Sequence, residues 1–211
     1  ALFIHHFGDP ATNPMGWPQR KVSDFVAKFV GGKNLQAGDG AVSPLRILKV
    51  SAVTSGQYVE AESKPAPNDH TAPKEHFVRE GDLLFSRANT SELVGATALV
   101  DRTNGCTLLP DKVWRFVWRE EVDPVYMWAL FQSKYVRQEL SLLASGTSDS
   151  MRNISQAKLF DLQLPLAPVQ EQRRFGEQAR AALSIRKQQS TALVKAQSTF
   201  DALLAQAFAP T

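Results

Sequence analysis

The stretch from residue 169 to residue 208 constrains the fold more than any other part of the sequence. It contains no proline and one glycine, Gly176. Apolar and small residues recur there at gaps of mostly three, four and seven, which predicts a single long helix with a coiled-coil seam. At ~1.5 Å per residue such a helix is a rod of roughly 60 Å. The residues that we expect in its interface are Phe175, Ala182, Ile185, Gln189, Ala192, Ala196, Phe200 and Leu203.

The composition of this seam indicates how the helix is used. It is rich in alanine and includes Gln189. It should therefore pack closely against a partner helix, as an antiparallel coiled coil, rather than stand alone. The alternative is a helix that folds back on its own domain. We favour the partner helix because a rod of this length overhangs a domain of the remaining size.

The residues before this helix predict a different kind of structure. Asp123 and Pro124 predict a helix N-cap and first helical position, and the apolar spacing carries that helix to about Leu143. A further short helix is expected with Ser155 as its N-cap. Strand-like runs separated by turn residues lie at residues 45–53, 83–86, 94–101 and 113–118, and an extended stretch at 162–168. Exposed loops are expected at residues 62–76 and 145–153.

These patterns predict an α+β fold in two parts. Residues 1–167 form a strand-rich domain, and residues 168–211 form the long helix. Hydrophobic residues make up 43% of the chain and charged residues 21%, so the domain can bury a core. No run of 18 apolar residues occurs, and we therefore expect no membrane span. The lone Cys106 cannot form an internal disulfide, which fits a cytoplasmic location.

The opening residues Ala1 to His6 lack the basic start and the long apolar stretch of a signal peptide. We interpret them as the end of a preceding element. On that interpretation the chain is either a fragment of a longer protein or a half-length version of one.

The net charge of +3 is unevenly distributed. Residues 1–167 hold 18 basic and 18 acidic residues, whereas residues 168–211 hold six and three. A neutral domain cannot hold nucleic acid by its bulk charge. If it binds DNA, its basic residues must gather on one face.

Motifs for catalysis are absent from the sequence. It has no GxGxxG motif and no P-loop, and His5, His6, His70 and His76 do not have metal-ligand spacing. Pro110-Asp111 with Lys112 lacks the second acidic residue of a metal nuclease. The motifs therefore argue against an enzyme, and we expect no metal and no cofactor.

Residues 81–95 read Gly-Asp-Leu-Leu-Phe-Ser-Arg-Ala-Asn-Thr-Ser-Glu-Leu-Val-Gly. This segment resembles the central motif of the specificity subunit of type I restriction-modification systems. The resemblance continues in order along nearly the whole chain, in Phe7 to Pro18, Leu109 to Lys112, Gly146 to Ser155, Leu164 to Gln172 and Phe200 to Phe208.

The resemblance implies an architecture and a function. A full specificity subunit has two target recognition domains joined by two antiparallel helices. Each domain reads one half of a split DNA sequence, and the helices set the gap between the halves and dock two methyltransferase subunits. This chain has one such domain and one helix. It would then be a non-catalytic subunit, either the C-terminal half of a full subunit or a half-subunit that pairs with its own copy.

The same resemblance implies the remaining partners. The docked methyltransferase would flip and methylate an adenine with its own S-adenosylmethionine, so this chain would bind no cofactor. Cleavage would belong to a further, ATP-driven restriction subunit that joins through the complex.

Candidate DNA contacts fall in two groups. Within the family motifs they are Arg87, Asn89, Thr90, Lys112, Thr147, Ser148, Ser150, Arg152 and Asn153. In segments free to vary they are Lys64, Lys74 and Arg102, with Lys33, Asn34, Asn68, His70, Thr103 and Asn104 beside them.

Each candidate also has a purely structural interpretation. Arg87 could pair with Glu80, Asp82 or Glu92 and only tie down its loop. The stretch from Gly146 to Asn153 could be a capping loop before the helix that starts at Ser155. Trp114, next to Arg115 and near Lys112, is expected in the core rather than in a basic-aromatic contact.

Two further classes of function stay open from the residues alone. The chain could be the DNA-reading C-terminus of a fused restriction-methylation enzyme, which an upstream methyltransferase domain would reveal. It could also be an interaction module that sequesters partners through its helix. In that case deletion of residues 169–211 would abolish function, while substitutions of Arg87 and Arg152 would not.

Overall fold

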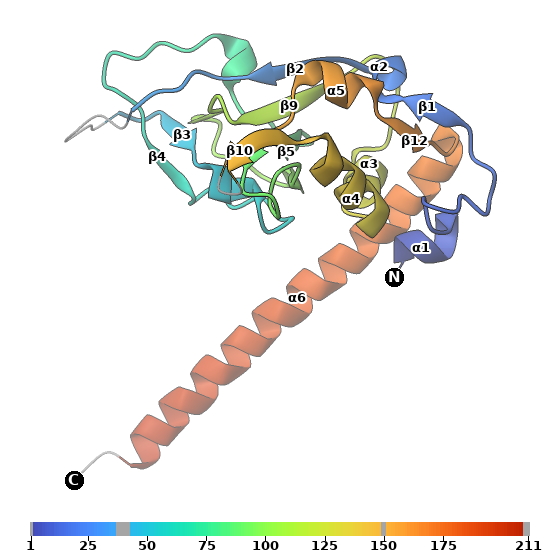
Figure 1. Cartoon of the computed structure of the whole chain (residues 1–211). Helices are drawn as coiled ribbons and strands as arrows, with labels where there is room; N and C mark the ends of the chain where they lie inside the picture. The colour runs from blue at the N-terminus through green and yellow to red at the C-terminus, as the bar shows by residue number, and fades with distance from the viewer. Residues whose placement is uncertain (1, 37–42, 149–150, 209–211) are drawn as a thin grey trace.

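The computed structural model describes residues 2–36, 43–148 and 151–208 (Figure 1). The α-helices are α1 (Leu2–Phe7), α2 (Val22–Phe25), α3 (Pro124–Phe131), α4 (Lys134–Leu143), α5 (Gln156–Asp161) and α6 (Val169–Ala207), with short 3-10 helices at Val50–Val53 and Lys74–His76. The strands are β1 (Gln19–Lys21), β2 (Val26–Gly31), β3 (Arg46–Leu48), β4 (Ser63–Pro65), β5 (Leu83–Ser86), β6 (Ala88–Asn89), β7 (Thr97–Leu99), β8 (Thr107–Leu108), β9 (Val113–Trp118), β10 (Ser145–Ser148), β11 (Met151–Asn153) and β12 (Gln163–Pro165). The α+β prediction is confirmed.

An antiparallel sheet in the order β2-β9-β5-β7 forms the centre of the domain. Strand β5 is buried on both faces, because its Leu83 and Phe85 belong to one cluster of apolar side chains and its Leu84 to another. The first cluster contains side chains from all six α-helices, including Phe3 of α1 and Phe175 of α6. The second lies beneath the 3-10 helix at Val50–Val53.

Smaller sheets surround this centre. Strand β3 pairs with β4 antiparallel and with β8 in parallel, and β1 pairs with β12. Strands β10, β11 and β6 form a third small sheet, in that order. Each of these pairings joins segments distant in sequence, except the β10–β11 hairpin.

The helix starts that were predicted from capping residues are confirmed. The Asp123 side chain accepts hydrogen bonds from the backbone N–H groups of Val125 and Tyr126 at the start of α3. The Ser155 hydroxyl accepts one from Lys158 N–H at the start of α5. These caps satisfy backbone donors that a helix leaves without partners in its first turn.

Helix α6 packs on the domain only at its beginning. Gln172, Phe175 and Ala179 are buried, whereas from Arg180 to Phe208 every residue whose burial is described is exposed. Figure 1 shows the rest of the helix projecting from the domain as a rod, with α1 lying beside its start. The division at residues 167 and 168 stays a prediction, and the first turns of α6 contribute to the core of the domain.

Several element predictions were wrong in detail. Residues 45–53 are a strand only at Arg46–Leu48, and Val50–Val53 form a 3-10 turn. A strand would point Ala52 and Val53 to opposite faces, and the turn instead buries both completely. The helix expected from Asp123 to Leu143 breaks at Ser133, which caps α4.

Tertiary pairing accounts for the other differences. The loop predicted at residues 62–76 contains β4, because Ser63–Pro65 find a partner in β3. The loop predicted at residues 145–153 contains the paired strands β10 and β11, and β11 also pairs with β6. The strand predicted at residues 94–101 is limited to Thr97–Leu99, and β2 was not predicted at all.

Candidate nucleic-acid interface

The small sheet β10-β11-β6 brings together the segments in which the family motifs placed most candidates. Arg152 of β11 lies opposite Asn89 of β6, and Asn153 lies opposite Ala88. The backbone of Arg87 connects β11 to the segment before β9. Its carbonyl accepts from the N–H of Ile154, directly after β11, and its N–H donates to Lys112 O. Three stretches separated by more than twenty residues therefore meet at one place, marked by β10 in Figure 1. We call this place the motif sheet.

The side chain of Arg87 is anchored on the turn before β9. Its Nε donates to the carbonyl of Asp111 at 2.7 Å, and a guanidinium nitrogen lies 3.8 Å from the Asp111 carboxylate. The guanidinium also lies 5.6 Å from the centroid of the Trp114 ring, within the range of a cation–π contact. None of the acidic partners proposed from the sequence takes part, and Arg87 holds the motif sheet to the turn.

Asn89 and Thr90 shape the turn after β6. Asn89 Nδ2 donates to Ser86 Oγ at 3.3 Å, and its Oδ1 accepts from the N–H of Thr90 at 2.9 Å. The carbonyl of Thr90 then accepts from the N–H groups of Leu93 and Val94. The amide of Asn89 is thus engaged in local structure, as expected for Asn in turns.

Arg152 is tied to the end of α4. A terminal nitrogen of its guanidinium donates to Ala144 O at 2.6 Å, and Lys158 Nζ donates to Leu143 O at 3.1 Å. Cations are favourable there because the last carbonyls of a helix carry partial negative charge. The Nε of Arg152 is buried without a hydrogen-bond partner among the described residues.

A second partly buried guanidinium, that of Arg137 on α4, was not predicted from the sequence. It donates to Glu92 O at 3.0 Å and thereby holds the turn after β6. Burial lowers the pKa of Arg137, and one of its terminal nitrogens has no partner among the described residues. Glu92 and Arg137 are 45 positions apart in the sequence, so no local pattern could have pointed to this contact.

Lys112 differs from these arginines. It stands directly before β9, next to the Asp111 on which Arg87 is anchored. Within the described part of the chain its ammonium group makes no ion pair and no hydrogen bond, and the side chain is half-buried. Among the described residues, Lys112 is therefore a cation beside the motif sheet whose charge is not used by another side chain.

The remaining candidates of this group are placed as follows. Asn153 lies on β11, where its carbonyl accepts from Ser145 Oγ at 3.4 Å. The side chains of Thr147 and Ser148, and Ser150 as a whole, lie outside the described residues.

The candidates that were expected in segments free to vary belong to other parts of the fold. Lys64 on β4 donates to Leu35 O at 2.7 Å, whereas Lys74 on the second 3-10 helix and Arg102 after β7 are exposed. Lys33, Asn34 and Asn68 are also exposed, and His70 is half-buried. The structure does not bring these residues into the motif sheet.

Glu60 organises the turn that contains Thr103 and Asn104. Its carboxylate accepts from the hydroxyls of Thr103 and Thr107, at 2.7 and 2.9 Å, and from Asn104 N–H. Burial by itself would raise the pKa of Glu60, but these hydrogen bonds and one from Tyr58 together lower it below the ordinary value of 4.5. The Thr103 hydroxyl and the Asn104 backbone N–H are therefore already hydrogen-bonded to Glu60.

The predicted interface of the long helix is largely exposed. Ala182, Ile185, Gln189, Ala192, Ala196, Phe200 and Leu203 are all accessible. Phe175 is the exception and corrects the prediction: it is 3% exposed and packs edge-on against Phe3 and Phe7. The first turns of α6 face the domain, so Phe175 is not available to a partner helix.

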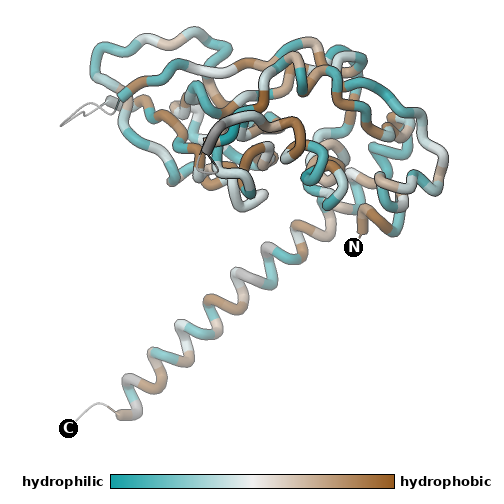
Figure 2. The backbone as a smooth tube through the Cα atoms, viewed as in Figure 1, coloured by the Kyte–Doolittle hydropathy of each residue, from teal (hydrophilic) through white to brown (hydrophobic). Residues whose placement is uncertain are grey.

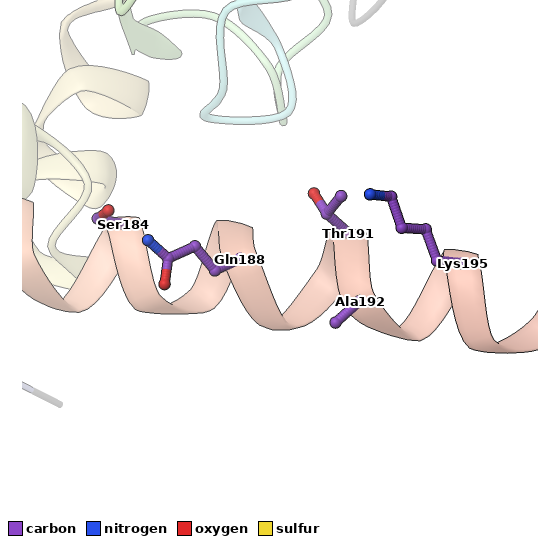
Figure 3. A pocket seen from close by; sticks show the side chains of 5 residues that line it. All are labelled: Ser184, Gln188, Thr191, Ala192 and Lys195. Carbon is purple, nitrogen blue, oxygen red and sulfur yellow. The ribbon is translucent and has the colours of Figure 1, made fainter.

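The projecting part of α6 has polar and apolar sides. A hollow alongside it is lined by Ser184, Gln188, Thr191, Ala192 and Lys195. Figure 3 shows Thr191 and Lys195 pointing to one side of the helix and Ala192 to the opposite side. Hydrophilic and hydrophobic segments accordingly alternate along the rod in Figure 2.

Neither a metal site nor a membrane span emerges from the described residues. They contain no group of three or more His, Cys, Asp or Glu side chains that could hold a metal ion. In the same residues no helix is sufficiently long and apolar to cross a bilayer.

Comparison with solved structures defines the class of fold. The chain resembles the S subunit of a type I restriction-modification system from M. genitalium, with a TM-score of 0.53 over 87% of this chain, 42% of that chain and 13% identity. It also resembles the HsdS subunit from Thermoanaerobacter tengcongensis, with a TM-score of 0.52, 93% and 44% coverage and 19% identity. The fold is that of an HsdS specificity subunit.

Sequence comparison leads to the same family. The chain is 29% identical over 164 residues to the type I restriction enzyme EcoEI specificity subunit of Escherichia coli, covering 75% of this chain and 27% of the relative. It is 30% identical over 168 residues to the EcoKI specificity subunit of Escherichia coli strain K12, covering 77% and 36%. No family model matches the chain. The chain is thus a homologue of type I restriction enzyme specificity subunits and spans less than half the length of these relatives.

Proposed function

We propose that this chain is the sequence-specific DNA-binding component of a type I restriction-modification system. It reads one half of a split target and docks the adenine methyltransferase subunit. The observation that carries the proposal is the motif sheet, which gathers Arg87, Lys112 and Arg152 from three distant segments of a domain with no net charge. Local gathering of cations is what a neutral domain needs in order to hold a polyanion.

The roles of the three cations differ in this proposal. Arg87 and Arg152 donate to backbone carbonyls, and they fix the shape of the surface. The ammonium group of Lys112 has no partner among the described residues, and it serves as the phosphate contact that sets the register of the domain on the duplex. Bases are then read by side chains from other parts of the domain, for which Lys33, Lys74 and Arg102 are accessible.

The long helix supplies the second half of the function. Its exposed apolar side pairs with a partner helix, either from a second copy of this chain or from another recognition half. The pair spaces two recognition domains and docks the methyltransferase, which holds S-adenosylmethionine. In this scheme the chain itself is non-catalytic and needs no cofactor, and a restriction subunit joins through the complex.

Two matched variants test the DNA-binding part. Lys112 and Arg119 flank β9 at opposite ends, which are ~20 Å apart at 3.3 Å per residue. Neither side chain has a hydrogen-bond or ion-pair partner among the described residues, and each substitution by alanine removes one positive charge. A mobility-shift assay with the partner methyltransferase and a random duplex pool gives the selected target for the wild-type chain.

We expect the complex to enrich a bipartite sequence. Lys112→Ala should weaken binding to all duplexes uniformly and reduce the salt slope by about one, as for loss of a phosphate contact. Arg119→Ala should bind like the wild type. The proposal is wrong if the wild-type complex enriches no sequence. If Lys112→Ala and Arg119→Ala lose DNA affinity equally, the motif sheet is not the DNA-binding surface.

A further inference from the structure

The start of α6 is joined to α3 through a buried carboxylate. Asp123 is 5% exposed, and its Oδ1 accepts from the N–H groups of Val125 and Tyr126 at 2.9 and 3.0 Å. Its Oδ2 accepts from the guanidinium of Arg180 on α6. One carboxylate thus caps α3 and holds α6, so the two helices share a fixed point.

Gly176 of α6 lies against the same carboxylate. A Cβ atom at this position would stand 2.3 Å from Oδ2 and 2.5 Å from Cγ of Asp123, closer than real Cβ contacts. Glycine destabilises a helix interior more than any residue except proline. Its presence in the buried part of α6 is explained by packing, because a larger residue would collide with Asp123. Only a residue without a side chain lets the axis of α6 come this close to α3.

A second set of hydrogen bonds surrounds this point. Gln172 is 2% exposed; its Oε1 accepts from Asp123 N–H at 3.0 Å, and its Nε2 donates to Ala167 O at 2.7 Å. The N–H of Ala167 in turn donates to the hydroxyl of Tyr126 at 3.1 Å. The helix is held by directional bonds in addition to the apolar contacts of Phe175, and such bonds resist a change of angle.

A small change of angle here becomes a large displacement at the far end of α6. From Gly176 to Ala202 the helix extends about 39 Å at 1.5 Å per residue. A tilt of ~10° about the fixed point moves Ala202 by about 7 Å over that length. Successive base pairs are separated by ~3.4 Å, so this tilt corresponds to about two base pairs.

We propose that Asp123, Gly176 and Arg180 form a joint that sets the angle between the recognition domain and α6, and through it the number of base pairs between the two target halves. The inference rests on the proposed function, to which it adds the residues that determine spacing. Asp123 and Gly176 are positioning residues and contact no DNA.

The angle can be measured on the isolated chain, without DNA. Spin labels are attached at Gln138→Cys on α4 and Ala202→Cys on α6 in a Cys106→Ser background, and the labelled chain is diluted with unlabelled chain. Pulsed dipolar spectroscopy then gives the distance between the two labels within one chain.

Gly176→Ala displaces the Asp123 carboxylate and should shift the mean distance between the labels by several Å. Arg180→Gln removes the outer bond at a half-exposed side chain and should broaden the distribution. Ala181→Ser, an exposed neighbour, is the matched control and should change neither.

The result that overturns the joint is a wild-type distance distribution in both variants. Thermal melting followed by circular dichroism identifies any variant that fails to fold. If Gly176→Ala does not fold, Arg180→Gln still tests the joint. A purely structural role would lower the melting temperature without moving the distance in the folded chain.

The consequence for DNA is tested by selecting bipartite targets with the methyltransferase complex. Gly176→Ala should select the same half-site bases with a spacer that differs by one or two base pairs, and Ala181→Ser the wild-type spacer. Unchanged spacing in a variant whose distance has shifted refutes the role in spacing. If the wild-type complex selects no target, the proposed function is wrong and the spacing role falls with it, while the distances still decide whether the joint sets the angle.

Discussion

At the scale of single residues, several arginine side chains of this domain hold backbone carbonyls in place. Arg115 on β9 is a deeply buried cation of this kind: it is 6% exposed and donates to the carbonyls of Phe77 and Glu75 and to the carboxylate of Asp82. Burial raises the pKa of Asp82, although Arg115 and the N–H of Arg79 favour its charged form. Such a cluster is costly to break because its members cannot be rehydrated in place.

Arg115→Ala is therefore expected to destabilise the domain by about 3–5 kcal/mol, the usual cost of leaving a buried charge without its partner. Arg119→Ala, one residue beyond the same strand and exposed, should change stability by no more than ~0.5 kcal/mol. Urea unfolding followed by circular dichroism measures both. Equal and small losses would show that the carbonyls of residues 75 and 77 do not depend on this guanidinium.

Glu60 gives a pH dependence with a definite sign. Its pKa in the folded chain is lowered from 4.5, so its charged form stabilises the fold at pH values above 4.5. That contribution is lost as the pH falls from 4.5 through the lowered pKa of the folded state. Glu60→Gln should be less stable than the wild type at pH 7, and the difference should shrink below pH 4.5. Urea unfolding at both pH values checks this, and a difference that stays constant with pH would contradict it.

At the scale of elements, helix α6 consists of two parts with different surroundings. Its first turns are buried against α1 and α3, and the rest is exposed with Ile185, Leu193 and Phe200 on its surface. The helical periodicity is the same in both parts. Periodicity reports which side of a helix is apolar, but it does not report what covers that side.

Two identical substitutions separate these surroundings. Phe175→Ala should cost about 3–5 kcal/mol, because it removes a buried ring from the aromatic cluster with Phe3 and Phe7. Phe200→Ala should leave the stability of the dilute chain within ~0.5 kcal/mol of the wild type, since Phe200 is 57% exposed. Thermal melting at low protein concentration compares the two. A large loss for Phe200→Ala in a monomeric sample would mean that the end of α6 folds back on its own domain.

At the scale of the whole molecule, we expect the exposed apolar side of α6 to pack against a partner helix, because pairing would remove its side chains from water. Pairing with a second copy would be a two-fold arrangement and would give a palindromic target. We expect light scattering to show a mass that rises toward the dimer with concentration, and Phe200→Ala to move this transition to higher concentration. A chain that stays monomeric at high concentration would leave the partner helix to another protein.

The sequence by itself determined what depends on local chemistry. The long helix follows from forty residues without proline, the starts of α3 and α5 from Asp123 and Ser155, and β5 and β9 from their apolar runs. In each case the deciding interactions lie within a few residues of each other. Capping bonds and helical periodicity are interactions of this kind.

Only the tertiary structure decided which distant segments meet. Pairing with β6 gives strand β11 where a loop was predicted, and pairing with β3 gives strand β4 at Ser63–Pro65. Arg87 takes Asp111 as its partner rather than any of the nearer acidic residues, and Phe175 packs on its own domain. The reason is physical: a hydrogen bond or an apolar contact across the fold depends on which surfaces are brought together, and a single sequence carries no local record of that.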